Sequence, residues 1–322
     1  MIAGTERRML ATNGVEIETF IAGRGTPVVL CHGFPELAYS WRHQVGPLVD
    51  GGYRVIVPNQ RGFGASSRPV EVEAYDLDSL SGDIVGLLDA LGEERAVLVG
   101  HDWGAPVVWH TALRHPERVL GVTSLSVPHG RRGTVPPLEA MRAAAGPGFV
   151  HYVDYFQTPG VAEAEFEGDV RASLLGFIWS ISGDVPKEAR FRPIPAGGRF
   201  IDSITVPLAL PPWLSQADFA VYVKAFKRSG FRGGLNWYRN VARNWERSSD
   251  LAEAKISQPA LFITGSRDPA RNPAAIERLR EVVPHLVGTH ILEGCGHWTQ
   301  QERPHDVNRL LRDWLPTLSR GH

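Results

Sequence analysis

Short apolar runs rich in β-branched residues alternate in this chain with longer amphipathic stretches, and this alternation constrains the fold most. The runs at 27–33, 53–59, 96–102 and 119–127 are strand-sized, and the third reads as a strand buried on both faces. Residues 76–91 carry apolar side chains with a 3.6-residue period, which predicts a helix with one buried face. We therefore predict a parallel sheet covered by helices. Further strands are predicted at 8–12, 15–22, 259–265 and 288–294.

The middle of the chain departs from this alternation. Residues 129–245 hold helical stretches and a Pro/Gly-rich loop, but no clear run with the character of a buried strand. Ser215 and Asp218 resemble a capping box that opens one helix, Gly230 ends that helix, and a second helix is predicted at 235–245. The simplest organisation is one α/β core interrupted by an inserted helical cap. The predicted parts are core, cap and core, at 1–128, 129–245 and 246–322.

Charge and composition favour a protein that acts on a small molecule. The chain has 34 basic and 35 acidic residues, a formal net charge of −1, and no long block of Lys and Arg. This balance indicates neither a nucleic-acid footprint nor a membrane-surface patch. The N-terminus lacks the apolar stretch of a secretory signal, and the apolar runs are too short to span a membrane, which favours a cytoplasmic protein. Whether the chain forms a homodimer is left open.

The segment Gly100-His101-Asp102-Trp103-Gly104 joins a predicted buried strand to an apolar helix that starts near Ala105. This arrangement is typical of a nucleophile elbow, a tight turn that pushes the central side chain out over the sheet. The flanking glycines relieve crowding in such a turn, and the following helix N-terminus favours negative charge. The motif predicts Asp102 as a nucleophile. Alone, it also fits a helix N-cap, a position that Asp fills well.

Two further residues follow strands in the order that a catalytic triad of this architecture requires. Asp268 comes just after the strand at 259–265, and His297 comes just after the strand at 288–294. Taken singly, Asp268 also fits a turn residue before proline, and His297 fits an ordinary loop histidine. Three such coincidences at three strand ends favour a triad of nucleophile, acid and histidine.

The loop after the strand at 27–33 predicts the remaining part of such a site. In this architecture that loop supplies one backbone N–H of an oxyanion hole, and the residue after the nucleophile supplies the other. We assign these donors to Phe34, within His32-Gly33-Phe34-Pro35-Glu36, and to Trp103. Their side chains are also candidates for the walls of the pocket.

Five segments together closely resemble the soluble epoxide hydrolases of the α/β-hydrolase superfamily. They are HGFPE, GHDWG, YFQTPGVAEAE, GFRGGLNWYRN and CGHWTQ, and the likeness runs from about residue 13 to residue 318. The first two motifs are shared with related families, whereas the third and fourth, in the predicted cap, are specific. The resemblance implies a mostly parallel eight-stranded sheet with a helical cap, in a bacterial-type hydrolase without an N-terminal phosphatase domain. The strand order it implies separates Cys31 from Cys295 by about 19 Å, so both are expected to be free thiols.

The resemblance also implies roles for two tyrosines in the predicted cap. In that family two cap tyrosines hold the epoxide oxygen, and the motifs place them here at Tyr152 and Tyr238. Tyr155 lies three residues from Tyr152, but the motif register favours Tyr152. Part-buried tyrosines are more commonly packing residues with a satisfied hydroxyl. A phenol with a pKa near ~10 is nevertheless neutral before reaction and acidic enough to protonate a departing alkoxide.

The implied reaction converts an epoxide and water to a vicinal diol through an alkyl ester on Asp102. An ionised carboxylate needs no base to attack an sp³ carbon. His297, oriented by Asp268, would then activate a water that attacks the carbonyl carbon of the ester. The backbone N–H groups of Phe34 and Trp103 would stabilise the resulting oxyanion. No metal or organic cofactor is expected.

Other functions on the same scaffold are weighed against this prediction. A haloalkane dehalogenase shares the Asp nucleophile, but its halide site typically uses Asn where Phe34 stands, although Trp103 fits it. A fluoroacetate-type dehalogenase would carry Arg at position 103, and a serine esterase is excluded because the central residue of the elbow is Asp102. A catalytically silent binding protein would be expected to show a damaged triad. A hydrophobic epoxide is favoured, because apolar side chains are available in the predicted cap as lining: Phe156, Phe177, Ile178 and Trp179.

Overall fold

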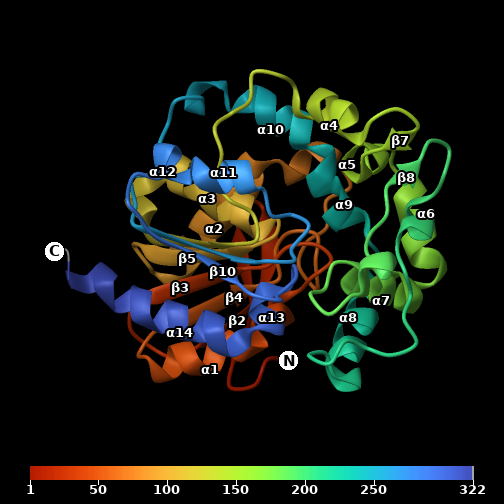
Figure 1. Cartoon of the computed structure of the whole chain (residues 1–322). Helices are drawn as coiled ribbons and strands as arrows, with labels where there is room; N and C mark the ends of the chain where they lie inside the picture. Colours follow the sequence, from red (N-terminus) through yellow and green to blue (C-terminus); the bar gives the residue numbers. More distant parts are fainter. Residues whose placement is uncertain (321–322) are drawn as a thin grey trace.

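The computed structural model describes residues 1–320, and its centre is one eight-stranded sheet (Figure 1). The spatial order of the strands is β1-β2-β4-β3-β5-β6-β9-β10. β1 and β2 pair antiparallel, β2 pairs antiparallel with β4, and the remaining neighbours are parallel. The mostly parallel sheet predicted from the sequence is therefore confirmed. The strands are β1 (Glu6–Thr12), β2 (Val15–Ala22), β3 (Pro27–Cys31), β4 (Arg54–Pro58), β5 (Ala96–His101), β6 (Val119–Leu125), β9 (Ala260–Gly265) and β10 (Leu286–Leu292).

Helices cover both faces of the sheet and enclose one apolar cluster on each side (Figure 1). Alternate residues of β3 belong to opposite clusters, with Val28 on one side and Val29 on the other, as the two-residue period of a strand requires. The side with Val28 is covered by α1 and α14, and the side with Val29 by α2, α3 and α12. The helices of the core are α1 (Arg42–Asp50), α2 (Leu77–Leu91), α3 (Gly104–Arg114), α11 (Pro273–Glu277), α12 (Leu279–Val282), α13 (Thr299–Glu302) and α14 (Pro304–Trp314).

The chain between β6 and β9, residues 126–259, forms the inserted region, which lies beside the core in Figure 1. It is mainly helical, but it also contains a two-stranded antiparallel sheet, which the sequence did not indicate because each strand has two residues. Its elements are α4 (Pro137–Ala145), β7 (Phe149–Val150), α5 (Tyr152–Tyr155), α6 (Val161–Gly168), α7 (Val170–Ser180), β8 (Ile194–Pro195), α8 (Gln216–Ser229), α9 (Arg232–Arg239) and α10 (Val241–Arg247).

Of the two helices predicted in the inserted region, one is confirmed and the other is wrong. Ser215 caps α8 by accepting a hydrogen bond from the backbone N–H of Asp218 at 3.1 Å, and Gly230 ends the helix, as predicted. The single helix predicted at 235–245 is wrong, because the chain breaks into α9 and α10 at Asn240. The amide of Asn240 donates to the backbone carbonyls of Val72 and Asn236, at 2.6 and 2.9 Å. A side chain that bonds to nearby carbonyls competes with helical geometry.

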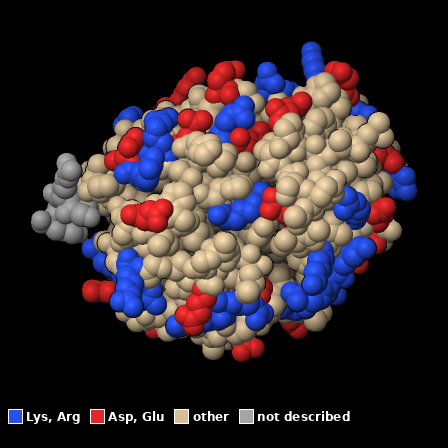
Figure 2. Space-filling model, turned by 90° about the horizontal axis from the view of Figure 1, so that it is seen from below, with Lys and Arg blue, Asp and Glu red and all other residues tan. Residues whose placement is uncertain are grey.

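Three global expectations can be compared with the described residues. Cys31 on β3 and Cys295 after β10 are buried free thiols, and four strand spacings separate those strands, as expected. Across residues 1–320 the structure has no helix that is both long and apolar enough to cross a bilayer. Basic and acidic side chains are interspersed on the face shown in Figure 2, consistent with the balanced charge of the chain.

Candidate active site

Asp102 stands at the sharp turn between β5 and α3, with a φ of 50°. This left-handed conformation is unfavourable for a residue with a side chain and costs on the order of 1–3 kcal/mol. A Cβ atom at Gly100 would overlap the backbone of Gly104, and one at Gly104 would overlap the carbonyl of Cys31. The turn therefore requires glycine at both positions. The predicted elbow is present, and it directs the Asp102 carboxylate away from the sheet.

Both oxygens of the Asp102 carboxylate have polar neighbours. Oδ1 accepts a hydrogen bond from the backbone N–H of Phe34 at 2.7 Å. Oδ2 lies 3.4 Å from Nε2 of His297. A Cβ atom at Gly33 would overlap the Asp102 side chain, so glycine at that position permits the close approach of the loop. The structure thus brings Phe34 and His297 to the same carboxylate.

Both the side chain and the backbone of His297 are held by hydrogen bonds. Its Nδ1 lies 2.9 Å from Oδ1 of Asp268, which also accepts from the backbone N–H of Ala270 at 2.8 Å. Its backbone N–H donates to the carbonyl of Ile181 at 3.0 Å, and its carbonyl accepts from Nε2 of His101 at 2.7 Å. These contacts orient the imidazole, so that it bridges Asp268 and Asp102.

The charges of this cluster depend on one another. Burial disfavours the imidazolium of His297, but the adjacent Asp268 and Asp102 carboxylates outweigh burial and raise its pKa well above the usual range. Burial also disfavours the charged form of Asp268 and so raises its pKa. The charge and hydrogen bond of His297 outweigh burial, and the pKa of Asp268 is lowered. The resting site therefore holds an imidazolium between two carboxylates at neutral pH.

Tyr152, on α5, and Tyr238, on α9, face the same cavity as Asp102. Their ring centroids are 6.0 Å apart with an interplanar angle of 75°. Burial, followed by the nearby Asp102 charge, raises the pKa of both phenols, so both are protonated at neutral pH. Tyr155 does not line this cavity, because its hydroxyl donates to Glu165. The structure therefore separates the two tyrosines that the motifs select from their neighbour.

The cavity has a volume of about 120 Å³ and a mostly apolar lining. Of the predicted lining residues only Phe177 faces it, because successive residues of α7 point about 100° apart. Phe156 packs behind the two tyrosines, Ile178 lines a separate crevice beside Trp298, and Trp179 faces neither. The prediction was wrong for those three residues. The full lining is Phe34, Asp102, Tyr152, Phe177, Ile181, Phe191, Phe200, Tyr238, Pro269, Ala270 and His297.

Comparisons with known proteins agree with this geometry. Residues 26–162 match the family model described as alpha/beta hydrolase fold. Over 321 residues the chain is 48% identical to epoxide hydrolase A of Mycobacterium tuberculosis, covering 99% of each chain. The crystal structure of epoxide hydrolase A from Mycobacterium thermoresistibile matches with a TM-score of 0.92 at 47% identity, covering 98% of each chain. The chain belongs to the epoxide hydrolases of the α/β-hydrolase fold.

A longer member of this epoxide hydrolase family is also similar. The chain is 41% identical over 314 residues to bifunctional epoxide hydrolase 2 of Sus scrofa, which covers 97% of this chain and 55% of that protein. An epoxide hydrolase from an endophytic Streptomyces matches in structure with a TM-score of 0.95 at 43% identity, covering 99% of this chain and 97% of the other. These relatives support the resemblance that the five motifs carried.

Phe34 and Trp103, which the sequence suggested as pocket walls, differ in this epoxide hydrolase. The Phe34 ring lines the cavity, 5.5 Å from the ring of Tyr238. The Trp103 indole does not line it, and instead packs edge-to-face on Tyr238 and Trp237, at 5.1 and 6.2 Å. The indole therefore does not line the space in which a halide would have to bind. This geometry speaks against the haloalkane dehalogenase alternative.

Sequence reasoning missed the buried carboxylate of Glu36. It accepts hydrogen bonds from the backbone N–H of Gly33, from Nδ1 of His101, and from the side-chain amides of Gln300 and Gln301, at 2.6 to 3.1 Å. Burial opposes its charge, yet His101 and these donors lower the pKa of Glu36 to about 2. Glu36 thus connects the loop that approaches Asp102 to the elbow and to the segment after His297. The available signal was a charged residue in the loop that follows an apolar strand, five residues after Cys31.

Glu302 is a second positioning residue that the sequence did not reveal. Its carboxylate accepts from the backbone N–H groups of Gly296 at 2.8 Å and Trp298 at 3.1 Å, on either side of His297. It also accepts from the N–H of Gly183 at 3.0 Å. Gly183 belongs to the inserted region, so one buried carboxylate connects that region to the histidine loop. No local pattern in the sequence predicts a contact across so many residues.

Proposed function

We propose that this protein hydrolyses a small hydrophobic epoxide to a vicinal diol, through an ester formed on Asp102. The observation that carries the proposal is the cavity itself. The ionised carboxylate of Asp102 lines this cavity, and so do the two neutral phenols of Tyr152 and Tyr238. A nucleophile and two proton donors in one apolar space suit the opening of a three-membered ring. Family membership supports the same reaction.

Ring opening uses the carboxylate and the phenols together. An oxygen of Asp102 forms a bond to one ring carbon, and the bond between that carbon and the epoxide oxygen breaks. Tyr152 and Tyr238 donate hydrogen bonds to the departing oxygen, and one phenolic proton passes to it. The raised pKa of the two phenols is closer to the pKa of the alcohol that forms. This match favours a strong hydrogen bond and keeps the phenols neutral at rest.

Ester hydrolysis begins with a change in charge at Asp102. The ester is neutral, so it removes one of the two carboxylates that raise the pKa of His297. The proton of His297 can then pass, by way of solvent, to the phenolate left by ring opening. The neutral imidazole acts as a base toward water, while Asp268 holds its Nδ1. Water gives a proton to His297 as it attacks the carbonyl carbon of the ester. The tetrahedral intermediate then collapses, the bond between that carbon and the diol oxygen breaks, and the diol oxygen takes the proton from His297. The backbone N–H of Phe34, already 2.7 Å from Oδ1, and that of Trp103 are the proposed oxyanion donors.

The inserted region has a defined part in this proposal. We assign residues 129–245 as a cap domain that supplies both phenols and most of the apolar lining. A cytoplasmic setting is also proposed, supported by the free thiols of Cys31 and Cys295, since reducing compartments keep cysteines in that form.

Incubation with styrene oxide tests the proposal directly. The parent protein should form phenylethanediol, and Asp102→Ala should not exceed the rate without protein. A parallel incubation with 1-chlorohexane should release no chloride. Chloride release without diol formation would replace this proposal by the dehalogenase alternative, and inactivity toward epoxides of several sizes would favour a silent binding protein.

A further inference from the structure

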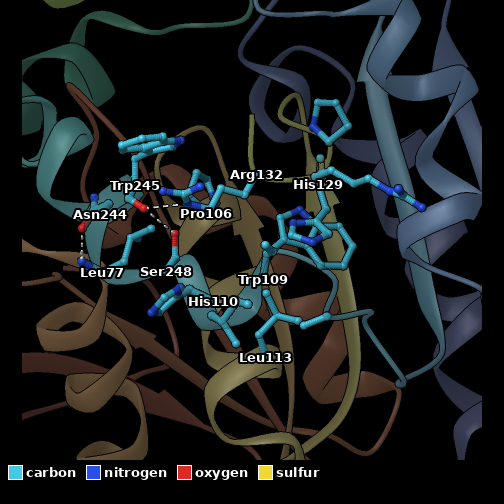
Figure 3. Close-up of a pocket in the computed structure, with 16 residues that line it drawn as sticks. Leu77, Pro106, Trp109, His110, Leu113, His129, Arg132, Asn244, Trp245 and Ser248 are labelled. Atoms are coloured by element: carbon cyan, nitrogen blue, oxygen red, sulfur yellow. Dashed lines mark hydrogen bonds between the residues drawn. The ribbon is translucent and has the colours of Figure 1, made fainter. Parts of the chain in front are cut away.

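A second cavity, outside the catalytic site, lies where the inserted region joins the core (Figure 3). Its volume is about 240 Å³, against about 120 Å³ for the catalytic cavity, and the two share no lining residue. One wall is α3 of the core. The others are residues 128–132, which leave the sheet toward the cap, and residues 244–254, on which the chain returns. The cavity therefore borders both connections between the two parts.

Flat aromatic surfaces form much of this cavity. Trp109 on α3 lies beside the ring of His129, with centroids 5.6 Å apart and an interplanar angle of 38°. On another wall the guanidinium of Arg132 lies 3.8 Å from the centroid of the Trp245 ring. Figure 3 shows these side chains around one space. Planar surfaces of this kind favour a planar, apolar ligand body such as an aromatic ring.

The polar groups of the lining are mostly donors. Among the described residues that line the cavity there are two arginines, Arg131 and Arg132, and no Asp or Glu. The carboxylate of Asp78, which lies outside the lining, binds His110 at 2.8 Å and Arg247 at 2.9 Å. Arg131 lies 3.9 Å from the carboxylate of Glu253, so Arg132 supplies the positive charge that is available to a ligand.

Two of these donors are only partly engaged. Nε of Arg132 donates to the carbonyl of Trp245 at 2.8 Å, which leaves the outer guanidinium nitrogens, and no acidic residue pairs with Arg132 within residues 1–320. The ring of His129 has no hydrogen-bond partner among the described residues. Burial lowers the pKa of His129 to about 4, so at neutral pH its ring is uncharged and offers one N–H.

We propose that this cavity is a second binding site, for a small aromatic carboxylate, at the junction of core and cap. The ligand ring packs in the space between Trp109 and Trp245, and its carboxylate accepts hydrogen bonds from Arg132 and His129. An arginine fork matches the two oxygens of a carboxylate. Because the ligand touches both connecting segments, its binding also stabilises the docking of the cap on the core.

Calorimetric titration with 2-naphthoate tests the site on the whole protein. Arg132→Gln should weaken binding at least about tenfold, the loss expected when a charged hydrogen-bond donor is removed. Arg228→Gln, on α8 and outside both cavities, is the matched control and should bind as the parent does. The uncharged analogue 2-naphthamide should bind more weakly than 2-naphthoate. Equal binding of the two, or none by 2-naphthoate at ~10 mM, would overturn the proposal.

The catalytic cavity is the competing location for the same probe. Tyr238→Phe alters that cavity and should leave the affinity for 2-naphthoate unchanged. With ¹⁵N-labelled tryptophan, saturating 2-naphthoate should shift the indole N–H resonances of Trp109 and Trp245 and not that of Trp298, beside the catalytic histidine. These readouts remain decisive if Arg132→Gln folds poorly. Shifts confined to Trp298 would mean that the probe occupies the catalytic cavity, and the second site would be withdrawn.

Discussion

The two sides of the catalytic cavity are built by different means. The core side, with Asp102, Asp268 and His297, stands at strand ends and is held by hydrogen bonds to backbone and buried polar groups. The cap side presents Tyr152 and Tyr238, whose rings are held mainly by edge-to-face packing on other aromatic rings. Buried charges require several polar partners, whereas neutral phenols tolerate an apolar environment. The difference teaches that the charged groups lie just beyond the ends of the strands, while the phenols are carried by a packed aromatic layer.

The largest effect is expected on the core side. Because an ionised carboxylate needs no base, His297→Gln should still open the ring but should fail to hydrolyse the ester. Turnover should fall by about 10²–10⁴-fold, the usual contribution of a general base. Mass spectrometry should find the mass of one epoxide added to the peptide that contains Asp102, and Asp102→Ala should show no adduct.

Oxygen labelling checks the same division of labour. In a single turnover in ¹⁸O-water the diol should emerge unlabelled, because its new oxygen comes from Asp102, and the label should remain in the protein. A labelled diol from the first turnover would show direct attack of water on the epoxide. The covalent route would then be abandoned.

The cap side should lose activity in steps. Tyr152→Phe or Tyr238→Phe alone should slow ring opening by about 10–100-fold, and the double variant by at least about 10³-fold, because the alkoxide then has no phenolic donor. Single-turnover alkylation of the His297→Gln background isolates this step. Tyr155→Phe is the matched control and should change the rate less than about twofold. If the double variant alkylates at the parental rate, the phenols are packing residues only.

The pH dependence should differ between the two half-reactions. At rest the two carboxylates raise the pKa of His297, and formation of the ester removes one of them, so the pKa falls. Hydrolysis needs the neutral imidazole and should slow about tenfold per pH unit below that lowered pKa. Ring opening does not use His297 as a base and should persist there. Quenched-flow experiments between pH 8 and 5 should therefore find ester accumulating on the acid side, whereas a constant ester fraction would contradict this scheme.

Glu302 links the two sides, and its replacement should have a smaller, selective effect. Glu302→Gln keeps the shape but weakens the acceptor for three backbone N–H groups, and should cost about 1–3 kcal/mol of stability. It should slow ester hydrolysis several-fold more than ring opening, because its donors flank His297. A lower unfolding temperature with an unchanged ratio of the two rates would reduce Glu302 to a structural residue.

The contrast between the two sides of the cavity also explains which parts of the site the sequence predicts. Asp102 and Asp268 come within three residues of the ends of the buried strands β5 and β9, and His297 comes five residues after the edge strand β10. A strand end is a local signal, so the core side of the site is predictable. Phe191 lies in irregular chain and Phe200 begins a four-residue 3-10 helix, and segments this short carry no periodicity. The contact of Glu302 with Gly183, like the helix break at Asn240, depends on partners distant in sequence. Such features follow from tertiary packing and not from local preference.

The left-handed backbone conformation of Asp102 sets the stability of the fold against the presence of the nucleophile. A side chain at a φ of 50° is tolerated only because the surrounding turn enforces it, so the nucleophile is carried at a position best suited to glycine. Asp102→Gly and Asp102→Ala both remove the carboxylate, yet the glycine variant should be more stable by about 1 kcal/mol in urea unfolding. Equal stability would show that the turn does not strain the side chain. Selection for thermal stability alone would therefore favour loss of the nucleophile, and only selection for turnover retains a side chain at this position.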